Sequence, residues 1–542
     1  MELIDREVIT STALVIDGNP TSRSVMTQNL RDFGFGTVKS VGRLIDARDQ
    51  IENRKYDIVI CDYHFEQGNE SGQDLLEELR REHMLPYSTV FVMVTGEATY
   101  QKVAEAAEAA LDSFLIKPFS ANTLFQRIKE SRQRKRELAD IFQAIESRQT
   151  ERAIDLCLER FEARQKYWLY AARIGAELLL MHKRFDEAMT LYNAVVEARA
   201  VPWAKLGVGR VQLANGDLSA SRRTLETLIG ESPQYADSYD VLGKVHMEQG
   251  QIEQALATYR MAADITPGCI LRLQHCGTLA FYAGDTQTAV RQLDRTWAMG
   301  SKSRLFDVLS MMLLAFLRFD AIDSKALHQA CEVLNRFSSH YPESLRLRRM
   351  NKLGALMRGL LEGQVAHHVL QARALLEEIE RPDFDMEAAT NLLSLWARLD
   401  RFGVEGEELK SAAERVGLRF CVSKASTEVL AAALRRHAEA PEWMRQSSAR
   451  VMKLAETAMN HSLSGEPGLA VATLLASGEE TGNAKLIEMA ALMAKRHQER
   501  IPEVQPLLDK AATLSHRFCQ PVSHIAGVRR TNRSAGGMVL RR

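Results

Sequence analysis

The sequence predicts a doubly wound, five-stranded parallel α/β domain followed by an all-α superhelix of paired helices. Short apolar runs, typical of strands covered on both faces, recur five times before residue 120, and each is followed by a helical pattern. From about Arg134 the strand signals stop. Glycines then recur every 34 residues, at Gly175, Gly209, Gly243 and Gly277, and such a fixed period is typical of helical repeats.

Composition narrows the class of protein. The chain has 542 residues, and its 70 Lys+Arg balance 70 Asp+Glu, so no overall charge draws it toward nucleic acid or an anionic membrane. Its longest mainly apolar run, residues 308–317, is shorter than the roughly 20 residues that cross a bilayer. The 7 cysteines form no Cys-x-x-Cys pair, which indicates reduced thiols. We therefore expect a cytoplasmic protein that does not span a membrane.

Five strand–helix units account for the first part of the chain. The expected strands are residues 13–16, 38–41, 58–61, 90–94 and 114–116. Strands alternating with helices favour a parallel sheet with right-handed crossovers. In such sheets the functional site lies outside the carboxyl ends of the strands, so the residues that follow each strand matter most.

Polar side chains stand at four of these strand ends. Asp17 follows the first strand, Asp62 the third, Thr95 the fourth and Lys117 the fifth. The two carboxylates could hold a divalent cation, and the cation and the lysine could neutralise a phosphoryl group. Any one of these residues alone would be an ordinary helix cap or a solvated end. Together they predict a phosphoryl site.

These residues resemble the receiver domain of response regulators, which has a flavodoxin-like fold. The resemblance covers about residues 12–132 and keeps the family's order of motifs. Its pieces are Val15-Ile16-Asp17, Ile60-Cys61-Asp62-Tyr63, Val94-Thr95-Gly96 and Phe114-Leu115-Ile116-Lys117-Pro118-Phe119.

The resemblance implies a role for each site residue. Asp62 would be the phospho-acceptor, and Asp62, Asp17 and the backbone carbonyl of His64 would hold Mg²⁺. Thr95 and Lys117 would contact the phosphoryl oxygens. The phosphoryl donor would be a sensor histidine kinase or a phosphotransfer protein.

Two further implications concern the switch and the backbone. Thr95 and Phe114 would be the residues that reorient on activation. The Lys117–Pro118 bond would be cis, a state that is accessible at low cost only before proline.

The sequence departs from the family pattern in two places. The family has two adjacent acids after the first strand, and Gly18 stands at the second position, which weakens the expected Mg²⁺ site. The segment from Asp62 to Gly72 is two residues longer than usual, and Glu66 or Glu70 in it could supply the missing carboxylate.

The repeat region resembles the tetratricopeptide repeat. Units begin near Trp168, Pro202, Ala236 and Ile270, and in the clearest one Gly243 is small where two helices cross. Gly250 would end the first helix of that unit. Beyond Met299 the match fades, but helical periodicity continues to about Ser515.

We predict four parts in the chain. They are a receiver domain at 1–132, tetratricopeptide repeats at 133–300, degenerate repeats of the same kind at 301–519 and a basic disordered tail at 520–542. Residues 130–137 contain no Gly or Pro, so the last receiver helix should continue into the first repeat. The tail could be inert, bind nucleic acid, or act as a ligand for the repeat groove.

Repeats of this kind bind a partner peptide or helix in a groove on their inner face. We expect that groove to bind an acidic segment through basic residues of the first helices. These residues are Arg173, Lys205, Arg210, Lys244 and Arg272. Each of them could also be simply solvated.

The sequence thus predicts a response regulator in a phosphorelay that is neither an enzyme nor a DNA-binding protein. Phosphorylation of Asp62 would modulate protein–protein interaction through the repeats. The alternative is a constitutive scaffold whose degenerate receiver is not phosphorylated, as Gly18 suggests. A transcription factor is a weaker hypothesis, because the sequence contains no helix-turn-helix segment. The sequence is also compatible with an oligomer.

Overall fold

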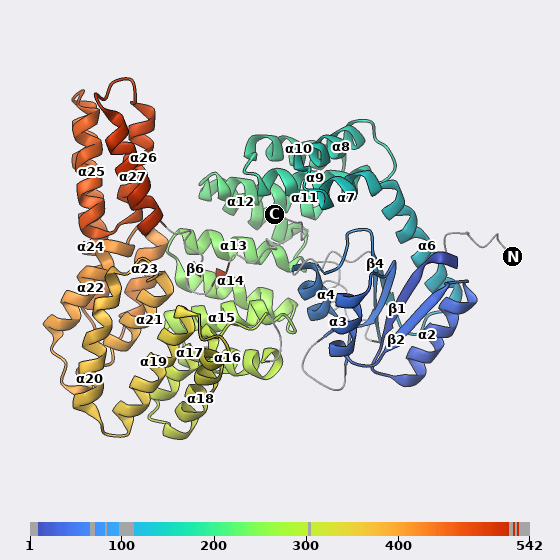
Figure 1. Cartoon of the computed structure of the whole chain (residues 1–542), viewed down its shortest axis with the longest axis horizontal. Helices are drawn as coiled ribbons and strands as arrows, with labels where there is room; N and C mark the ends of the chain where they lie inside the picture. Colours follow the sequence, from blue (N-terminus) through green and yellow to red (C-terminus); the bar gives the residue numbers. More distant parts are fainter. Residues whose placement is uncertain are drawn as a thin grey trace.

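The computed structural model describes residues 9–65, 71–81, 84–96, 113–301 and 305–519, with short strands at 524–525 and 528–529. An α/β domain lies at one end, and a chain of helices curves away from it (Figure 1). Within the described part of the chain, no helix is long and apolar enough to cross a membrane.

The α/β domain is built on a five-stranded, wholly parallel sheet in the order β2-β1-β3-β4-β5. Its strands are β1 (Thr12–Ile16), β2 (Thr37–Val41), β3 (Ile58–Asp62), β4 (Val90–Thr95) and β5 (Ser113–Ile116). Its described helices are α2 (Pro20–Asp32), α3 (Leu44–Asn53), α4 (Gly72–Arg81) and α6 (Ala121–Glu137). The predicted doubly wound fold is confirmed. The helix expected around Ala104–Ala110 lies outside the described residues.

Burial explains the apolar runs. Every residue of β3 and β4 is buried, because each of the two strands has a neighbour on both sides and apolar layers on both faces. Successive side chains of a strand point to opposite faces of the sheet, so they belong to two separate apolar clusters. One cluster contains Leu14 and Val59, and the other contains Val15 and Ile60. β2, the edge strand next to β1, is the least buried.

From α7 onward the described chain is helical as far as Phe518. The helices are α7 (Ala139–Glu146), α8 (Thr150–Glu162), α9 (Trp168–Met181), α10 (Phe185–Ala198), α11 (Pro202–Ala214), α12 (Leu218–Glu231), α13 (Ala236–Glu248), α14 (Ile252–Ile265), α15 (Ile270–Ala283), α16 (Thr286–Gly300), α17 (Leu309–Asp320), α18 (Ser324–His340), α19 (Leu345–Leu361), α20 (Val365–Ala374), η1 (Leu375–Glu380), α21 (Met386–Trp396), η2 (Asp400–Phe402), α22 (Gly406–Phe420), α23 (Lys424–Ala433), α24 (Ala440–Leu463), α25 (Pro467–Thr481), α26 (Ala484–Arg496) and α27 (Val504–Phe518).

The four predicted repeat starts are confirmed as the first residues of α9, α11, α13 and α15. Two helices cross closely at Gly243, as predicted, because a Cβ at this position would lie 2.5 Å from the Tyr259 ring of the paired helix. Gly250 follows α13 with a φ of +69°, a conformation that side chains beyond glycine rarely adopt.

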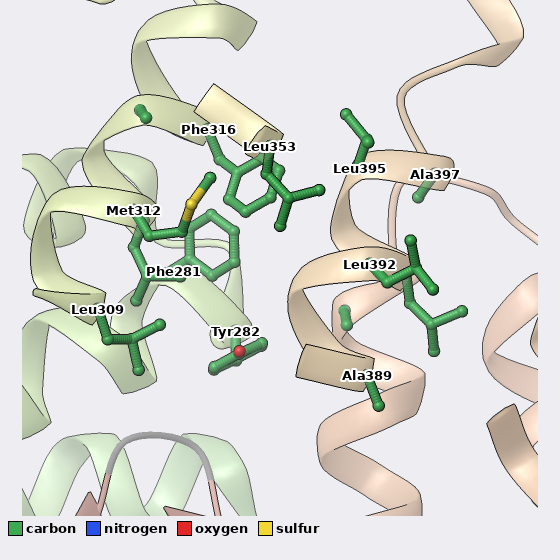
Figure 2. Packing of buried hydrophobic residues seen from close by; sticks show 14 of the residues in the cluster. Phe281, Tyr282, Leu309, Met312, Phe316, Leu353, Ala389, Leu392, Leu395 and Ala397 are labelled. Atoms are coloured by element: carbon green, nitrogen blue, oxygen red, sulfur yellow. The ribbon is translucent and has the colours of Figure 1, made fainter. Parts of the chain in front are cut away.

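The superhelix closes on itself. α23 packs against α13 and α15, which lie more than 100 residues earlier in the chain. At this contact Arg435 donates a hydrogen bond of 2.8 Å from Nη1 to the carbonyl oxygen of Tyr282. A single apolar cluster runs from Met247 to Met444 and includes Phe281, Tyr282 and Phe316 on one side and Leu392 and Leu395 on the other (Figure 2). The inner faces of α13 and α15 are therefore partly covered by later helices.

The receiver and the helical region share a core at Tyr87. Its ring stacks on Phe142 at 6.1 Å between centroids, and it belongs to the same cluster as Leu138 and Ile141. Its N–H donates to Glu146 Oε1 at 3.1 Å, and its carbonyl accepts from Lys135 Nζ at 2.5 Å. α6 runs unbroken through residues 130–137, but it does not continue into the first repeat as expected: it ends at Glu137, and α7 begins at Ala139 after Leu138.

Candidate functional site

Four polar residues meet at the carboxyl edge of the sheet. Asp17 directly follows β1, Asp62 ends β3, Thr95 ends β4 and Lys117 directly follows β5. Asp17 and Thr95 are fully buried, and Asp62 is 7% exposed. Because these strands are parallel neighbours, their carboxyl ends place all four residues in one crevice.

Lys117 joins the two carboxylates. Its Nζ lies 2.9 Å from Asp17 Oδ2 and 2.5 Å from Asp62 Oδ2. The backbone around it is held by a 2.7 Å hydrogen bond from the Lys117 N–H to the Thr95 carbonyl oxygen. The Lys117–Pro118 bond is cis, as the resemblance implied. The lysine therefore neutralises part of the charge of two buried acids.

The first turn of α2 orients Asp17. Its Oδ1 accepts a 2.7 Å hydrogen bond from the Asn19 N–H, and its Oδ2 accepts one of 2.6 Å from Ser22 Oγ. Arg23 Nη1 donates to the Asp17 carbonyl oxygen at 2.5 Å. Ser22 and Arg23 were not predicted as site residues. Their position in the first helical turn after Asp17 could have indicated from the sequence that they contact this residue.

Burial and hydrogen bonding act in opposite directions on the titration of the site. Burial raises the pKa of the Asp62 carboxyl above its usual value, although the hydrogen bonds from Lys117 and from the His64 N–H oppose this. Burial lowers the pKa of Lys117, but its hydrogen bonds to Asp62 and Asp17 outweigh burial and raise that pKa. Lys117 is thus held in its charged form.

The remaining predicted site residues lie around this crevice. The His64 N–H donates to Asp62 Oδ1 at 3.1 Å, so His64 borders the acceptor through its backbone. Phe114, on β5, is half-buried and packs against the cluster that contains Leu14 and Met93. The phosphoryl-contacting and switching roles of Thr95 and Phe114 stay predictions.

The carboxylates of Asp17 and Asp62 fit a Mg²⁺ ion. One oxygen of each carboxylate lies within 3 Å of Lys117 Nζ, so the two carboxylates face the same space. Mg²⁺ is commonly bound by one or two carboxylates plus waters. Among the described residues no cluster of three His, Cys, Asp or Glu side chains forms a fuller metal site. When bound, Mg²⁺ would neutralise charge on a phosphoryl group, and Asp17, Asp62 and the His64 carbonyl would hold it.

We expect Gly18→Asp to strengthen Mg²⁺ binding by roughly tenfold, because ligand charge sets affinity at such sites. A Cβ at Gly18 would meet only Phe65 Cδ1 at 3.6 Å and the Gly42 carbonyl oxygen at 3.9 Å, so the side chain fits. Isothermal titration calorimetry measures the change, and Gly18→Asn controls for size. Unchanged affinity would mean that Glu66 or Glu70, which lie outside the described residues, already completes the site.

The five basic residues expected in the inner groove do not stand exposed as predicted. Arg272 is 4% exposed, and its guanidinium donates to Asp237 at 3.0 Å and to Asp240 at 2.8 Å. Arg210 is held by the buried Glu177 at 2.5 Å. The expected exposure of these two residues is wrong because each neutralises a carboxylate of the preceding repeat.

The other three basic residues are half-buried. Lys205 pairs with Glu231, and the Arg173 guanidinium lies 5.8 Å from the centre of the Trp203 ring. Lys244 lies on α13 near the middle of the superhelix. Whether any of them contacts a partner stays a prediction.

Comparison with known proteins agrees with the geometry of the α/β domain. Residues 13–129 match the family described as the response regulator receiver domain. Over 115 residues the chain is 30% identical to the chemotaxis protein CheY-3 of Vibrio cholerae, a match that covers 21% of this chain and 86% of that protein. Over 117 residues it is 29% identical to the chemotaxis protein CheY of Pseudomonas aeruginosa, covering 22% of this chain and 92% of that protein. The solved CheY-like receiver domain protein of Methanospirillum hungatei aligns at 22% identity with a TM-score of 0.22, covering 24% of this chain and 98% of that one.

The α/β domain is thus a CheY-like receiver, and the chain belongs to the response regulator family. This membership places the protein in two-component signalling. Receiver domains of this family are non-enzymatic signalling modules that generally bind Mg²⁺ and interact with histidine kinases or phosphotransfer proteins. The helical remainder is consistent with a superhelix of the tetratricopeptide type.

Proposed function

We propose that the protein is a phosphorylation-controlled adaptor. A histidine kinase or phosphotransfer protein phosphorylates Asp62, and the receiver then changes how the helical region engages a protein partner. The observation that carries this proposal is the position of Lys117 Nζ, 2.5 Å from Asp62 Oδ2 and 2.9 Å from Asp17 Oδ2. A cation between two carboxylates can instead contact the oxygens of an added phosphoryl group.

The Tyr87 contact offers a route from the receiver to the helices. β4 carries Thr95 at its carboxyl end, and Tyr87 lies three residues before its first residue. A displacement of β4 therefore reaches the ring stack on Phe142 and the hydrogen bond to Glu146. α6 offers a second connection, because it runs unbroken from the receiver to Glu137 and only Leu138 separates it from α7.

The helical region supports the adaptor role because its consecutive helices pack in pairs, as α13 does on α14 and α15 on α16. We propose the receiver at 1–132, tetratricopeptide-type repeats at 133–300, degenerate repeats to 519 and a basic tail beyond. Arg173, Lys205 and Lys244 remain our candidates for partner contacts, while Arg210 and Arg272 join neighbouring repeats. None of the seven cysteines forms a disulfide, as suits the reducing cytoplasm in which we place the protein.

A constitutive scaffold is the second candidate, and Gly18 favours it. The two functions separate in one experiment, in which hydrogen exchange at the junction, residues 130–146, is compared before and after the receiver is loaded with beryllofluoride. If the protein is a phosphorylation-controlled adaptor, hydrogen exchange at the junction changes when beryllofluoride is bound. If it is a constitutive scaffold, hydrogen exchange there stays the same.

A further inference from the structure

One face of α21 is polar and yet buried. Glu387, Thr390, Asn391 and Ser394 follow the spacing i, i+3, i+4, i+7, so they share a face of the helix. Their exposures are 4%, 1%, 2% and 0%. Asn391 Oδ1 and Ser394 Oγ have no hydrogen-bond partner within the described part of the chain. Buried polar atoms are nearly always hydrogen-bonded, so these two atoms indicate a contact that the described residues do not supply.

A cavity of about 70 Å³ lies beside this face, between α19, η1 and α21. Glu387 and Asn391 line it, together with Arg346. Arg346 lies 2.6 Å from Asp307 and 2.6 Å from Glu387, so one guanidinium faces two carboxylates. The cluster therefore has one formal negative charge in excess, which suits a basic ligand.

A segment of this chain already lies against the same helix. β6 (His524–Ile525) packs on α21 and α23 and pairs antiparallel with β7 (Val528–Arg529). Residues 520–542 were expected to lack structure, and these two strands fall within that tail. They follow α27 in the chain, and the Phe518 ring at the end of α27 lies 5.3 Å from the Arg419 guanidinium near the end of α22.

The segment has the charge that the site needs. Residues 520–542 contain five arginines and no Asp or Glu, so they carry a formal charge of +5. Because the whole chain has a formal charge of 0, the remainder carries −5. The segment and the body of the protein are thus electrostatically complementary.

We infer that the polar face of α21, with the cavity beside it, is a docking site for an extended basic segment, and that residues 520–542 occupy it in cis. A partner that carries such a segment must displace the tail to bind. Because the tail is part of the same chain, its effective concentration at the site is on the order of millimolar. A free peptide therefore competes poorly with it. The inference rests on the proposed binding role of the helical region, and it can fail while phosphorylation of Asp62 stands.

A fluorescein-labelled peptide of residues 520–542 tests the inference by fluorescence anisotropy. We expect it to bind the chain truncated after Cys519 at least tenfold more tightly than the full chain. A matched peptide with its five arginines changed to glutamine should bind the truncated chain at least tenfold more weakly. Equal binding of the peptide to both chains, or no binding to a truncated chain with native circular dichroism, overturns the inference.

A second pair of variants locates the site. Asn391→Leu keeps the size of the side chain and removes its polar atoms, so it should weaken peptide binding to the truncated chain. Asn460→Leu, on the exposed surface of α24, should leave binding unchanged. If the peptide binds both variants with equal affinity, the docking site does not lie on α21.

A protease site inserted between Cys519 and Gln520 tests the inference without prior truncation. After cleavage of the folded full chain, the tail should co-elute with the body at low salt and separate at high salt, since salt screens the attraction. Separation at low salt overturns the inference even if the truncated chain does not fold.

Discussion

We expect acetyl phosphate with Mg²⁺ to add a phosphoryl group to Asp62 and to no other carboxylate of the chain. The reason is the convergence at its strand end, where Lys117 Nζ and the His64 N–H lie 2.5 and 3.1 Å from the two Asp62 oxygens. In the transfer an Asp62 oxygen bonds to phosphorus, and the bond from phosphorus to acetate breaks. Intact-mass and peptide mass spectrometry report the modification and its position.

Two variants control this prediction. Asp62→Asn should abolish the modification, because an amide oxygen is a far weaker nucleophile than a carboxylate. Asp49→Asn, in an exposed position on α3, should leave it unchanged. Modification at another residue, or none at saturating Mg²⁺, would contradict the phosphorylation account and favour the constitutive scaffold.

We expect Arg272→Ala to destabilise the helical region by about 3–5 kcal/mol, the cost of removing one partner of a buried ion pair. Arg272 is the cation shared by Asp237 and Asp240, and its Nη1 also donates to Thr266 Oγ1 at 2.6 Å. Asp237, which is only 4% exposed, would lose its ion pair with Arg272. Urea unfolding followed by circular dichroism measures the loss as a lower midpoint.

Arg222→Ala is the matched control. Arg222 pairs with Glu226 at 2.7 Å, but the two side chains are 45% and 46% exposed. An exposed pair of this kind contributes about 0.5 kcal/mol or less, so the midpoint should barely move. Equal shifts for the two variants would contradict the structural role assigned to Arg272.

The sequence was informative wherever a local pattern determines structure. The strands could be located because both faces of the sheet are covered, which makes each strand a continuous apolar run. Asp17, Asp62, Thr95 and Lys117 could be brought together because parallel strands end at the same edge. The 34-residue interval located four helix starts to the residue, since each repeat packs against a neighbour of similar structure.

The parts that escaped prediction depend on contacts between distant segments. Arg272 on a first helix looks like a groove residue, and only the positions of Asp237 and Asp240, 35 and 32 residues earlier, make it an internal ion-pair partner. The packing of α23 on α15 joins helices that no repeat pattern connects. Tyr87 follows a Pro in a short loop, where nothing in the sequence distinguishes a docking residue from a solvated one.

The most direct test of the central claim, that the receiver controls the helical region, is hydrogen exchange of the full chain with and without beryllofluoride, read by mass spectrometry. The account predicts altered exchange in residues 84–89 and 130–146, where Tyr87 contacts Phe142 and Glu146. Asp62→Asn should show no such change. Altered exchange confined to the receiver site, with the junction unchanged, would contradict the account.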